Sequence, residues 1–352
     1  MSVNNTTIGE AANTTQAIQT LNIIMEPAWL TIVRLTIECI IGVAGIIGNF
    51  AVCFAITKHR TLNIAPTNTL IRNVAIGDLA SLLISFPLDV VREQFTYWPL
   101  GEFTCRYIFP LTDVFFGVSV WSIAAIAVER RRILGADVPR LAFKSLAVPK
   151  LICAAIWVFS FLGISLPLVL IYKYYQSPDM KPICRPIWPD PKLSFIYSIA
   201  MSLFTYVIPL SLIFVTYCTI KRKLCKSESF HLEMAEQSFS GTIKTSQVTL
   251  VKSRSKRFNK IMTPVVVVFA ITVFPLTLFR ILILFYFTNP VFVEYSHVMF
   301  RICFFFYLLN SAINPLIYSI VNKRFRQSFK EMLAWTWWQV AEKVVRSKTH
   351  LR

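Results

Sequence analysis

Residues 297–321 read HVMFRICFFFYLLNSAINPLIYSIV, and this apolar stretch decides the fold. A helix needs about 20 predominantly apolar residues to cross a bilayer, so this stretch is long enough to do so. A strand of a closed membrane barrel needs only about 10 residues of alternating polarity, so a barrel is excluded. Pro315 lies inside the stretch, which is tolerated in membrane helices because neighbouring groups satisfy the freed backbone. The stretch therefore predicts a kinked membrane-spanning helix.

Six further stretches have the same character. They are residues 30–57, 66–91, 103–128, 148–172, 194–220 and 261–287. The chain of 352 residues is 55% hydrophobic and 15% charged, whereas soluble domains carry roughly 45–50% apolar and about 25% charged residues. Further interior prolines are Pro87, Pro167, Pro209 and Pro275. The sequence therefore predicts an all-α membrane protein with a seven-transmembrane helix bundle over residues 30–321, and short loops that leave no room for a soluble enzymatic domain.

The net charge of +18 is concentrated on one side of this predicted bundle. The segments on that side carry +19 in total, which accounts for the whole basic excess. They are residues 58–65, 131–150, 221–260 and 322–352. Because cytosolic loops are enriched in Lys and Arg, we expect a multi-pass membrane protein with its N-terminus outside and its C-terminus in the cytosol. The excess then reflects topology and attraction to anionic lipid, not nucleic-acid binding.

The N-terminal arm, residues 1–29, is polar and shows no cleavable signal peptide. It contains three Asn-X-Thr acceptor sequences, at Asn4, Asn5 and Asn13. The charge pattern places this arm outside the cell, where such sequences are glycosylated. We therefore expect an extracellular arm glycosylated at Asn13 and at Asn4 or Asn5.

The end of the chain has a different character. Residues 322–335 place Phe325, Phe329, Met332 and Leu333 on one face of a helix. This pattern predicts a short amphipathic eighth helix lying on the inner leaflet of the membrane. Residues 336–352 follow as a cytosolic tail without Cys, so a palmitoyl anchor is not expected there.

Several polar side chains fall inside the predicted spans, where they are costly and usually face the bundle interior. Asp78 lies in the second span, and Asn310 and Asn314 lie four residues apart on one face of the seventh. One interpretation is a set of interhelical hydrogen bonds that only hold the bundle together. A carboxylate at the middle of the membrane is more specific, because it needs either a cation or a proton.

Short motifs, one for each predicted span, give a more specific indication. They are Gly48-Asn49, the run from Asn73 to Asp78, Trp98 followed by Gly101 and Cys105, Glu129-Arg130-Arg131, Trp157, Pro209 with Tyr217, Phe269 with Pro275, and Asn314-Pro315-Leu316-Ile317-Tyr318. This ordered set resembles the rhodopsin-like (class A) G-protein-coupled receptors over about residues 30–335. The resemblance implies a cell-surface receptor that activates a heterotrimeric G protein, with arrestin and membrane lipid as further partners.

The resemblance also assigns roles to individual residues. It implies a disulfide between Cys105 and Cys184, although both could also be free thiols. It implies a role in G-protein coupling and activation for Glu129, Arg130, Tyr217, Asn314, Pro315 and Tyr318. It further implies a sodium ion, as an allosteric ion and not a cofactor, held by Asp78, Ser119, Asn310, Ser311 and Asn314. The competing interpretation is that Asp78 is protonated and hydrogen-bonded to Asn314.

The sequence departs from the family pattern at two positions. Val273 stands where the family usually has a ligand-sensing Trp, and Arg131 replaces the usual Tyr of the triplet. In addition, Leu308 stands where opsins carry the Lys that links retinal, so a photopigment and its cofactor are not expected.

The ligand is less well defined by the sequence. Aminergic receptors have an Asp where this chain has Thr112, and Asp113 points about 100° away on a helix. The mixed charge of the outer rim and the run Trp98-Pro99-Leu100-Gly101 look like those of neuropeptide receptors. The candidate ligand-binding residues are Asp89, Trp98, Thr112, Asp113, Arg280 and Arg301. An amine or lipid ligand remains an alternative, as does snorkelling of the two Arg side chains or their pairing with Glu294.

The polar residues inside the spans are also compatible with a protein of another class. An ion-coupled secondary transporter could use Asp78 as its coupling-ion site, although the two halves of the chain show no internal repeat. An enzyme is not expected, because the four His residues are not paired with a nucleophile inside the membrane. The sequence therefore favours a receptor, with a peptide as its ligand.

Overall fold

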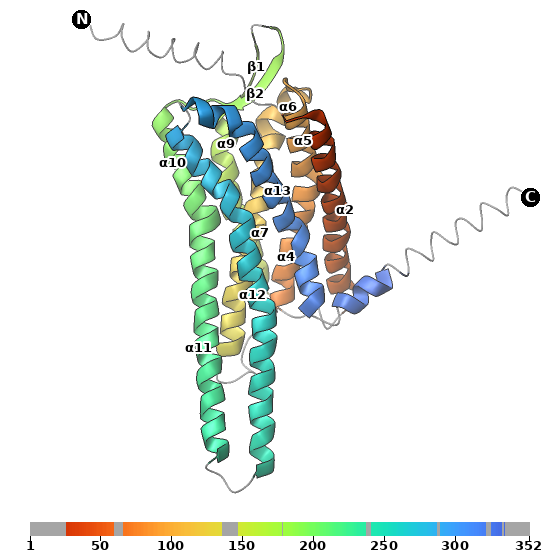
Figure 1. The fold of residues 1–352 in the computed structure, drawn as a ribbon, viewed down its shortest axis with the longest axis vertical. Coiled ribbons are helices and arrows are strands. Elements are labelled where there is room, and N and C mark those ends of the chain that lie inside the picture. The colour runs from red at the N-terminus through yellow and green to blue at the C-terminus, as the bar shows by residue number, and fades with distance from the viewer. Residues whose placement is uncertain are drawn as a thin grey trace, which may run out of the picture.

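The computed structural model describes residues 26–59, 66–135, 147–177, 179–236, 241–286, 289–321, 325–332 and 334. Figure 1 shows a bundle of long helices that lie side by side. Within the described residues, the helices that are long and apolar enough to cross a membrane number seven. They are Ala28–Lys58, Pro66–Gln94, Gly101–Arg132, Ala147–Ile171, Pro191–Lys226, Thr263–Tyr286 and Pro290–Ile320. The predicted seven-helix bundle is confirmed.

Several spans consist of more than one helical element. The α-helices are α2 (Ala28–Lys58), α4 (Pro66–Ala80), α5 (Phe86–Gln94), α6 (Gly101–Phe103), α7 (Phe109–Gly135), α8 (Ala147–Ser160), α9 (Leu166–Ile171), α10 (Pro191–Ser202), α11 (Ile208–Glu236), α12 (Gly241–Tyr286) and α13 (Pro290–Val321). Most of these ends agree with the apolar stretches to within a few residues.

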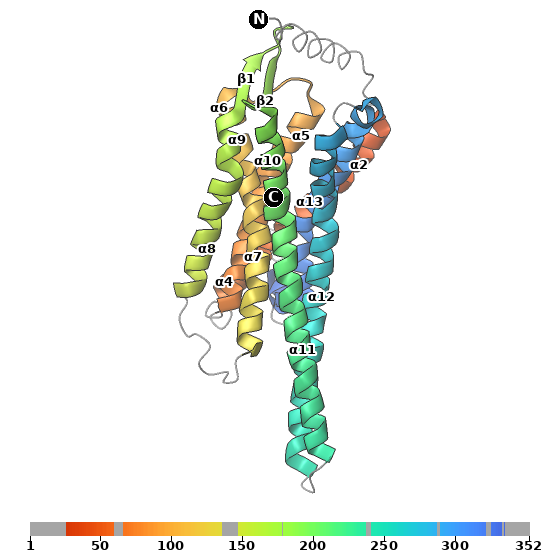
Figure 2. The same ribbon diagram turned by 90° about the vertical axis from the view of Figure 1, so that its left-hand side faces the viewer.

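The largest difference from the sequence prediction is at α11 and α12. We expected the fifth span to end at residue 220 and the sixth to begin at 261, with a connecting segment between them. Instead, α11 continues to Glu236 and α12 already begins at Gly241, so most of that segment is helical. Figure 1 and Figure 2 both show the two helices projecting together beyond the rest of the bundle. Hydropathy detects where the apolar character ends, whereas a helix continues through Lys, Arg and Glu residues that favour it.

A single turn of π-helix interrupts four of the spans. These turns are Ser81–Ser85, Thr104–Ile108, Phe161–Ser165 and Leu203–Val207. Each turn ends two residues before a proline, namely Pro87, Pro110, Pro167 or Pro209. A proline lacks an N–H and its ring clashes with the carbonyl four residues earlier, so the preceding turn widens. Pro275 and Pro315 lie inside continuous α-helices instead.

An antiparallel hairpin covers one end of the bundle. Its strands are β1 (Tyr172–Gln176) and β2 (Pro182–Pro186), with Tyr174 opposite Cys184. Cys184 forms a disulfide with Cys105 next to α7, so the predicted pairing is confirmed and the alternative of two free thiols is wrong. We call this the disulfide end, and the end from which α11 and α12 project the opposite end (Figure 1).

The interior of the bundle is polar in places, while many large apolar side chains face outward. Ile40, Phe214 and Leu316 are examples of exposed apolar residues, whereas Asn49 and Asp78 are completely buried. Such a distribution suits a protein whose outer surface contacts lipid. Gly48 explains one close approach, because a Cβ there would lie 2.9 Å from Pro315 Cβ. This contact brings α2 against α13, where the Asn49 amide donates to the Ser311 carbonyl at 3.0 Å.

Candidate functional site

A polar cluster surrounds Asp78 at the centre of the bundle. Ser119 Oγ on α7 donates to one carboxylate oxygen and Asn314 Nδ2 on α13 donates to the other, both at 2.8 Å. Ser311 also hydrogen-bonds to this carboxylate. The fifth member predicted from the sequence, Asn310, accepts a hydrogen bond from Thr272 of α12 at 3.0 Å. Three helices therefore converge on one buried carboxylate.

The chemistry of this cluster fits a hard monovalent cation. One carboxylate and two hydroxyl groups, those of Ser119 and Ser311, meet at Asp78. Oxygen donors of this kind suit hard cations. The Asn314 amide nitrogen donates both to Asp78 and to the Asn310 carbonyl at 3.1 Å, so this side chain orients the carboxylate.

Thr272 is a member of this cluster that sequence reasoning missed. It precedes Val273, the residue that replaces the usual Trp of the family. The Thr272 hydroxyl donates to Asn310, and both side chains are buried. In this chain a hydrogen bond therefore joins α12 to α13 next to Val273. A polar residue on the buried face of an apolar span is the signal that would have found it.

Two other motif residues, Asn73 and Trp157, take part in hydrogen bonds that connect helices. Asn73 on α4 donates to Ser122 on α7 at 2.8 Å and accepts from Trp157 Nε1 on α8 at 3.0 Å. Each partner is a polar group inside a predicted span. These hydrogen bonds connect α4, α7 and α8, and neither of them includes the Asp78 carboxylate.

The residues expected to couple to a G protein lie toward the opposite end. Glu129 forms an ion pair with Arg132 at 3.6 Å, and Arg130 is half-buried beside it. Tyr217 Oη lies 3.3 Å from Thr263 Oγ1, which connects α11 to α12. The role of Glu129 and Arg130 in coupling stays a prediction.

Tyr318 connects this region to the central cluster. It lies within electrostatic reach of both Asp78 and Arg130. Its ring is 6.3 Å from that of Phe325, which is buried against the bundle. Residues 325–332 are helical, while the rest of the predicted eighth helix, residues 322–324, 333 and 335, lies outside the described residues.

A cavity of about 370 Å³ opens at the disulfide end. Its walls come from α5, α7, α9, both hairpin strands, α12 and α13. They include Asp89, Arg92, Phe109, Thr112, Asp113, Tyr172, Leu276, Phe279, Arg280, Phe300, Phe304 and Tyr307. Four of the six predicted ligand-binding residues, Asp89, Thr112, Asp113 and Arg280, therefore line one cavity.

Arg92 also lines this cavity, although it was not predicted. Its guanidinium carbon lies 5.3 Å from the centre of the Phe109 ring and 5.0 Å from that of Phe300. Stacking between two aromatic faces stabilises a guanidinium and restricts its movement. Arg92 follows Asp89 by three residues, so both lie on the same face of α5. That spacing is the signal that would have found it.

The other two predicted ligand-binding residues lie outside the cavity lining. Trp98 is buried, donates its indole N–H to the Gly101 carbonyl at 2.9 Å, and packs against Phe109. Arg301 is buried as well and pairs with Glu26 and Glu93, not with Glu294.

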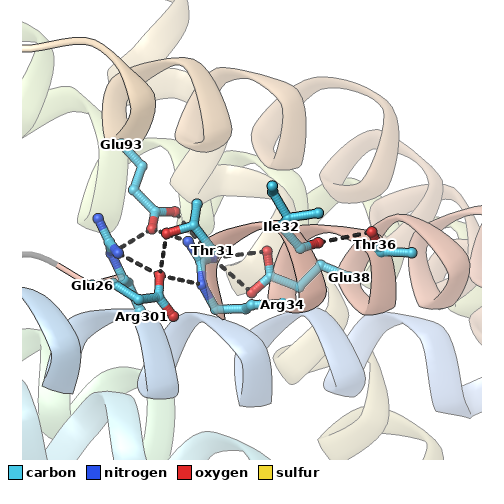
Figure 3. Close-up of polar contacts among 8 residues, drawn as sticks. All are labelled: Glu26, Thr31, Ile32, Arg34, Thr36, Glu38, Glu93 and Arg301. Carbon is cyan, nitrogen blue, oxygen red and sulfur yellow. Dashed lines mark hydrogen bonds and ion pairs between the residues drawn. The ribbon is translucent and has the colours of Figure 1, made fainter. Parts of the chain in front are cut away.

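Arg301 belongs to a cluster of five charged residues, which we call the ionic network (Figure 3). The members are Glu26, Arg34, Glu38, Glu93 and Arg301. They join α2 and Glu26, two residues before its start, to α5 and α13. Arg34 contacts Glu26 and Glu38 at 3.1 Å each and also pairs with Glu93. The Glu38 side chain is completely buried.

The electrostatics of Glu26 follow from this network. Burial by itself raises the pKa of the Glu26 carboxyl. Attraction to Arg34, hydrogen bonds from Thr31 and Arg34, and attraction to Arg301 outweigh burial and lower that pKa below its ordinary value. Glu26 is therefore ionised, and its ion pairs attach the last part of the N-terminal arm to α2 and α13.

Comparison with known proteins assigns the fold to a family. The sequence pattern described as "7 transmembrane receptor (rhodopsin family)" matches residues 48–318. The Neuromedin-K receptor of Oryctolagus cuniculus is 29% identical over 319 residues, covering 89% of this chain and 64% of that receptor. The chain thus spans less than two thirds of that relative's length.

Two further relatives are covered more completely. The Neuropeptide Y receptor type 6 of Mus musculus is 24% identical over 329 residues, covering 89% of this chain and 83% of the receptor. The Neuromedin-U receptor 2 of Mus musculus is 27% identical over 313 residues, covering 85% of this chain and 74% of the receptor. These matches do not favour the transporter alternative. The chain belongs to the rhodopsin family of seven-transmembrane receptors.

Proposed function

We propose that this chain is a plasma-membrane receptor that binds an extracellular peptide and activates a heterotrimeric G protein. The observation that carries the proposal is the family match over residues 48–318 combined with a cavity at the disulfide end. The names of the three relatives, Neuromedin-K, Neuropeptide Y type 6 and Neuromedin-U receptors, indicate peptide ligands. A lipid ligand is less suited, because four charged side chains line the cavity.

The charge pattern supports the orientation of this receptor. The positively charged segments adjoin the opposite end, which we place in the cytosol, and the disulfide end then faces outside. An oxidising exterior also suits the bond between Cys105 and Cys184. The proposed glycosylation sites Asn4, Asn5 and Asn13 lie outside the described residues, as does the proposed cytosolic tail, residues 336–352. Arrestin and inner-leaflet lipid are the further partners that we propose for the cytosolic face.

One face of α13 provides a path from the cavity to the opposite end. Tyr307 lines the cavity and donates to Ser81 Oγ at 3.4 Å. Asn310, Asn314 and Tyr318 follow at helical spacing and contact Thr272, Asp78 and Phe325, respectively. We propose that a ligand that displaces Tyr307 shifts α13, and that this shift changes the environment of Arg130 for the G protein.

Replacement of Arg130 tests coupling to the G protein. Arg130→Ala should abolish G-protein dissociation in transfected cells while leaving delivery to the cell surface unchanged. Arg106→Ala is a matched control, because Arg106 lies in an exposed pair with Glu102 at the disulfide end. Undiminished signalling by Arg130→Ala at equal expression would contradict the proposal.

We also propose that Asp78 holds a sodium ion in the inactive receptor, with oxygen donors from Ser119 and Ser311. An ion that binds only the inactive form lowers agonist affinity and raises thermal stability by mass action. Titration of NaCl against an osmotically matched choline salt should therefore raise the melting temperature of the parent but not of Asp78→Asn. A melting temperature indifferent to Na⁺ in the parent would favour a protonated Asp78 instead.

A further inference from the structure

Three charged side chains face the cavity without a direct contact to an oppositely charged group among the described residues. They are Asp89 on α5, Asp113 on α7 and Arg280 on α12. Within the described part of the chain, which includes every wall of the cavity, these side chains form neither a hydrogen bond nor an ion pair within 4.0 Å. All three side chains are half-buried, and the part of each that stays exposed faces the cavity. Charged groups withdrawn from bulk water without a partner are unfavourable for folding.

The fourth charged group, Arg92, differs from these three. The aromatic rings of Phe109 and Phe300 enclose its guanidinium, so it forms part of the wall. It acts electrostatically on Asp89 and, after Arg280, on Asp113. Arg92 therefore moderates the negative potential of the two carboxylates at longer range without pairing with either.

The arrangement of these groups indicates what a ligand must supply. Asp113 and Arg280 come from different helices and attract each other, but no ion pair within 4.0 Å joins them in the described part of the chain. A cationic group would pair with the carboxylates, and an oxygen acceptor would receive the N–H groups of Arg280. Both groups have to be present together, because a ligand with only one of them leaves the other charge buried and unpaired.

We propose that the cavity receives a peptide end that carries one cationic group, for Asp113 and Asp89, next to one carboxylate or carbonyl acceptor, for Arg280. This inference rests on the proposed function and specifies its ligand. A volume of about 370 Å³ is at the small end of the range for ligand cavities and accommodates the end of a peptide, not its whole length. Leu276, Phe279 and Phe304 supply apolar walls for the aliphatic part of a basic side chain.

Other ligand classes satisfy the cavity less completely. A simple amine would pair with the carboxylates but leave Arg280 without an acceptor. An acyl chain would leave all three charges unpaired. An acidic peptide end would serve Arg280 and meet repulsion from Asp89 and Asp113.

Synthetic octapeptide pools test the proposal with the full-length receptor in transfected cells. In each pool, one of the last three residues at the carboxyl end is fixed and the other two are randomised. The fixed residue is Arg or Lys in the basic pools and the uncharged norleucine in the control pools. Each pool is made with a free carboxylate and with an amide at this end. A parallel set randomises the amino-terminal end. G-protein dissociation is the readout. We expect the basic pools to be at least about tenfold more potent than the norleucine pools.

Receptor variants test which residue binds the cationic group of the ligand and which binds its carboxylate or carbonyl group. Asp113→Asn should weaken the response to basic pools at least about tenfold, and Asp113→Glu should restore part of it. Arg280→Gln should abolish any difference between carboxylate and amide ends. Glu102→Gln is the control, because Glu102 is an exposed carboxylate at the same end and lies outside the cavity. Cell-surface amount is measured for each variant, so that a folding defect is recognised.

The outcomes separate this inference from the proposed function. Equal potency of norleucine and basic pools would overturn the inference while leaving a peptide receptor. An unchanged response of Asp113→Asn to basic pools would also overturn it. A parent receptor that no pool activates would contradict both the peptide function and the inference.

Discussion

Two groups of charged residues lie close together at the disulfide end, and they differ in how they are paired. In the ionic network, three carboxylates and two guanidinium groups satisfy one another. In the cavity, Asp89, Asp113 and Arg280 have no such partner within the described residues. Arg92 and Glu93 are adjacent in α5, yet one lines the cavity and the other joins the network. Residues of the same type can therefore hold the fold together or remain available to a ligand, depending on which face of the helix they occupy.

Removing a charge from the ionic network should have the largest effect on stability. Arg34→Met leaves Glu38 buried without its cation, because Arg34 is the residue that pairs with it. Loss of one partner of a buried ion pair costs about 3–5 kcal/mol. Thermal unfolding in detergent should show this loss. Arg106→Met is the control, because the exposed pair of Arg106 and Glu102 contributes at most about 1 kcal/mol. Equal melting temperatures of the two variants would contradict the distinction.

A second substitution at Glu38 sharpens this test. Glu38→Gln removes the charge that Arg34→Met leaves unpaired, so the double variant should be more stable than the two single effects predict. Residues in direct contact show interaction energies of about 0.5–3 kcal/mol. The measurement is a double-mutant cycle by thermal unfolding. Simple additivity would show that Glu38 does not depend on Arg34.

The cavity should respond in the opposite direction. Asp113→Asn and Arg280→Gln each remove a charge that has no direct ion pair, so the cost of its desolvation disappears together with only the longer-range attraction between Asp113 and Arg280. We expect the free energy of unfolding of the ligand-free receptor to stay the same or to rise, by no more than about 1 kcal/mol. The same detergent-solubilised protein is used for comparison with Arg34→Met. A large loss of stability would mean that these charges support the fold.

The smallest effect concerns pH. The pKa of Glu26 is lower in the folded protein than its ordinary value of 4.5. Its contribution to stability is therefore complete above that pH and is lost as the pH falls through the folded pKa. The melting temperature of the parent should fall more steeply than that of Glu26→Gln between about pH 6 and pH 3.5. Parallel curves would show that Glu26 does not contribute to the network.

Much of the fold could be predicted from the sequence. The seven apolar stretches and the interior prolines are evident in the sequence, and the resemblance to the family implies the pairing of Cys105 with Cys184. The helical extensions of α11 and α12 were not, because hydropathy reports contact with lipid and not backbone conformation. The π-helical turns were missed for a related reason. An apolar stretch surrounded by lipid has no strong periodicity that would show one extra residue in a turn.

The sites were predictable to the extent that they depend on short motifs. Asp78 and Asn314 were expected together, and the structure pairs them. The ionic network was missed, because Glu26 and Arg301 are 275 residues apart and no local pattern links them. Arg301 was therefore assigned to the ligand, whereas the structure pairs it with two carboxylates. Only the packing of α2 against α5 and α13 reveals these partners.

The π-helical turn at Ser81–Ser85 has a consequence for the evolution of this receptor. A π-turn holds one residue more than an α-turn, and one residue corresponds to about 100° of rotation. Deletion of a single residue in this turn would convert it to an α-turn and leave Asp78 and α5 facing the same way. Asp89 and Arg92 would still line the cavity, and Glu93 would still face Arg34. A deletion inside a regular helical turn would instead rotate everything beyond it by about 100°. The π-helical turn is thus the place in this span where one residue can be lost without disturbing either site.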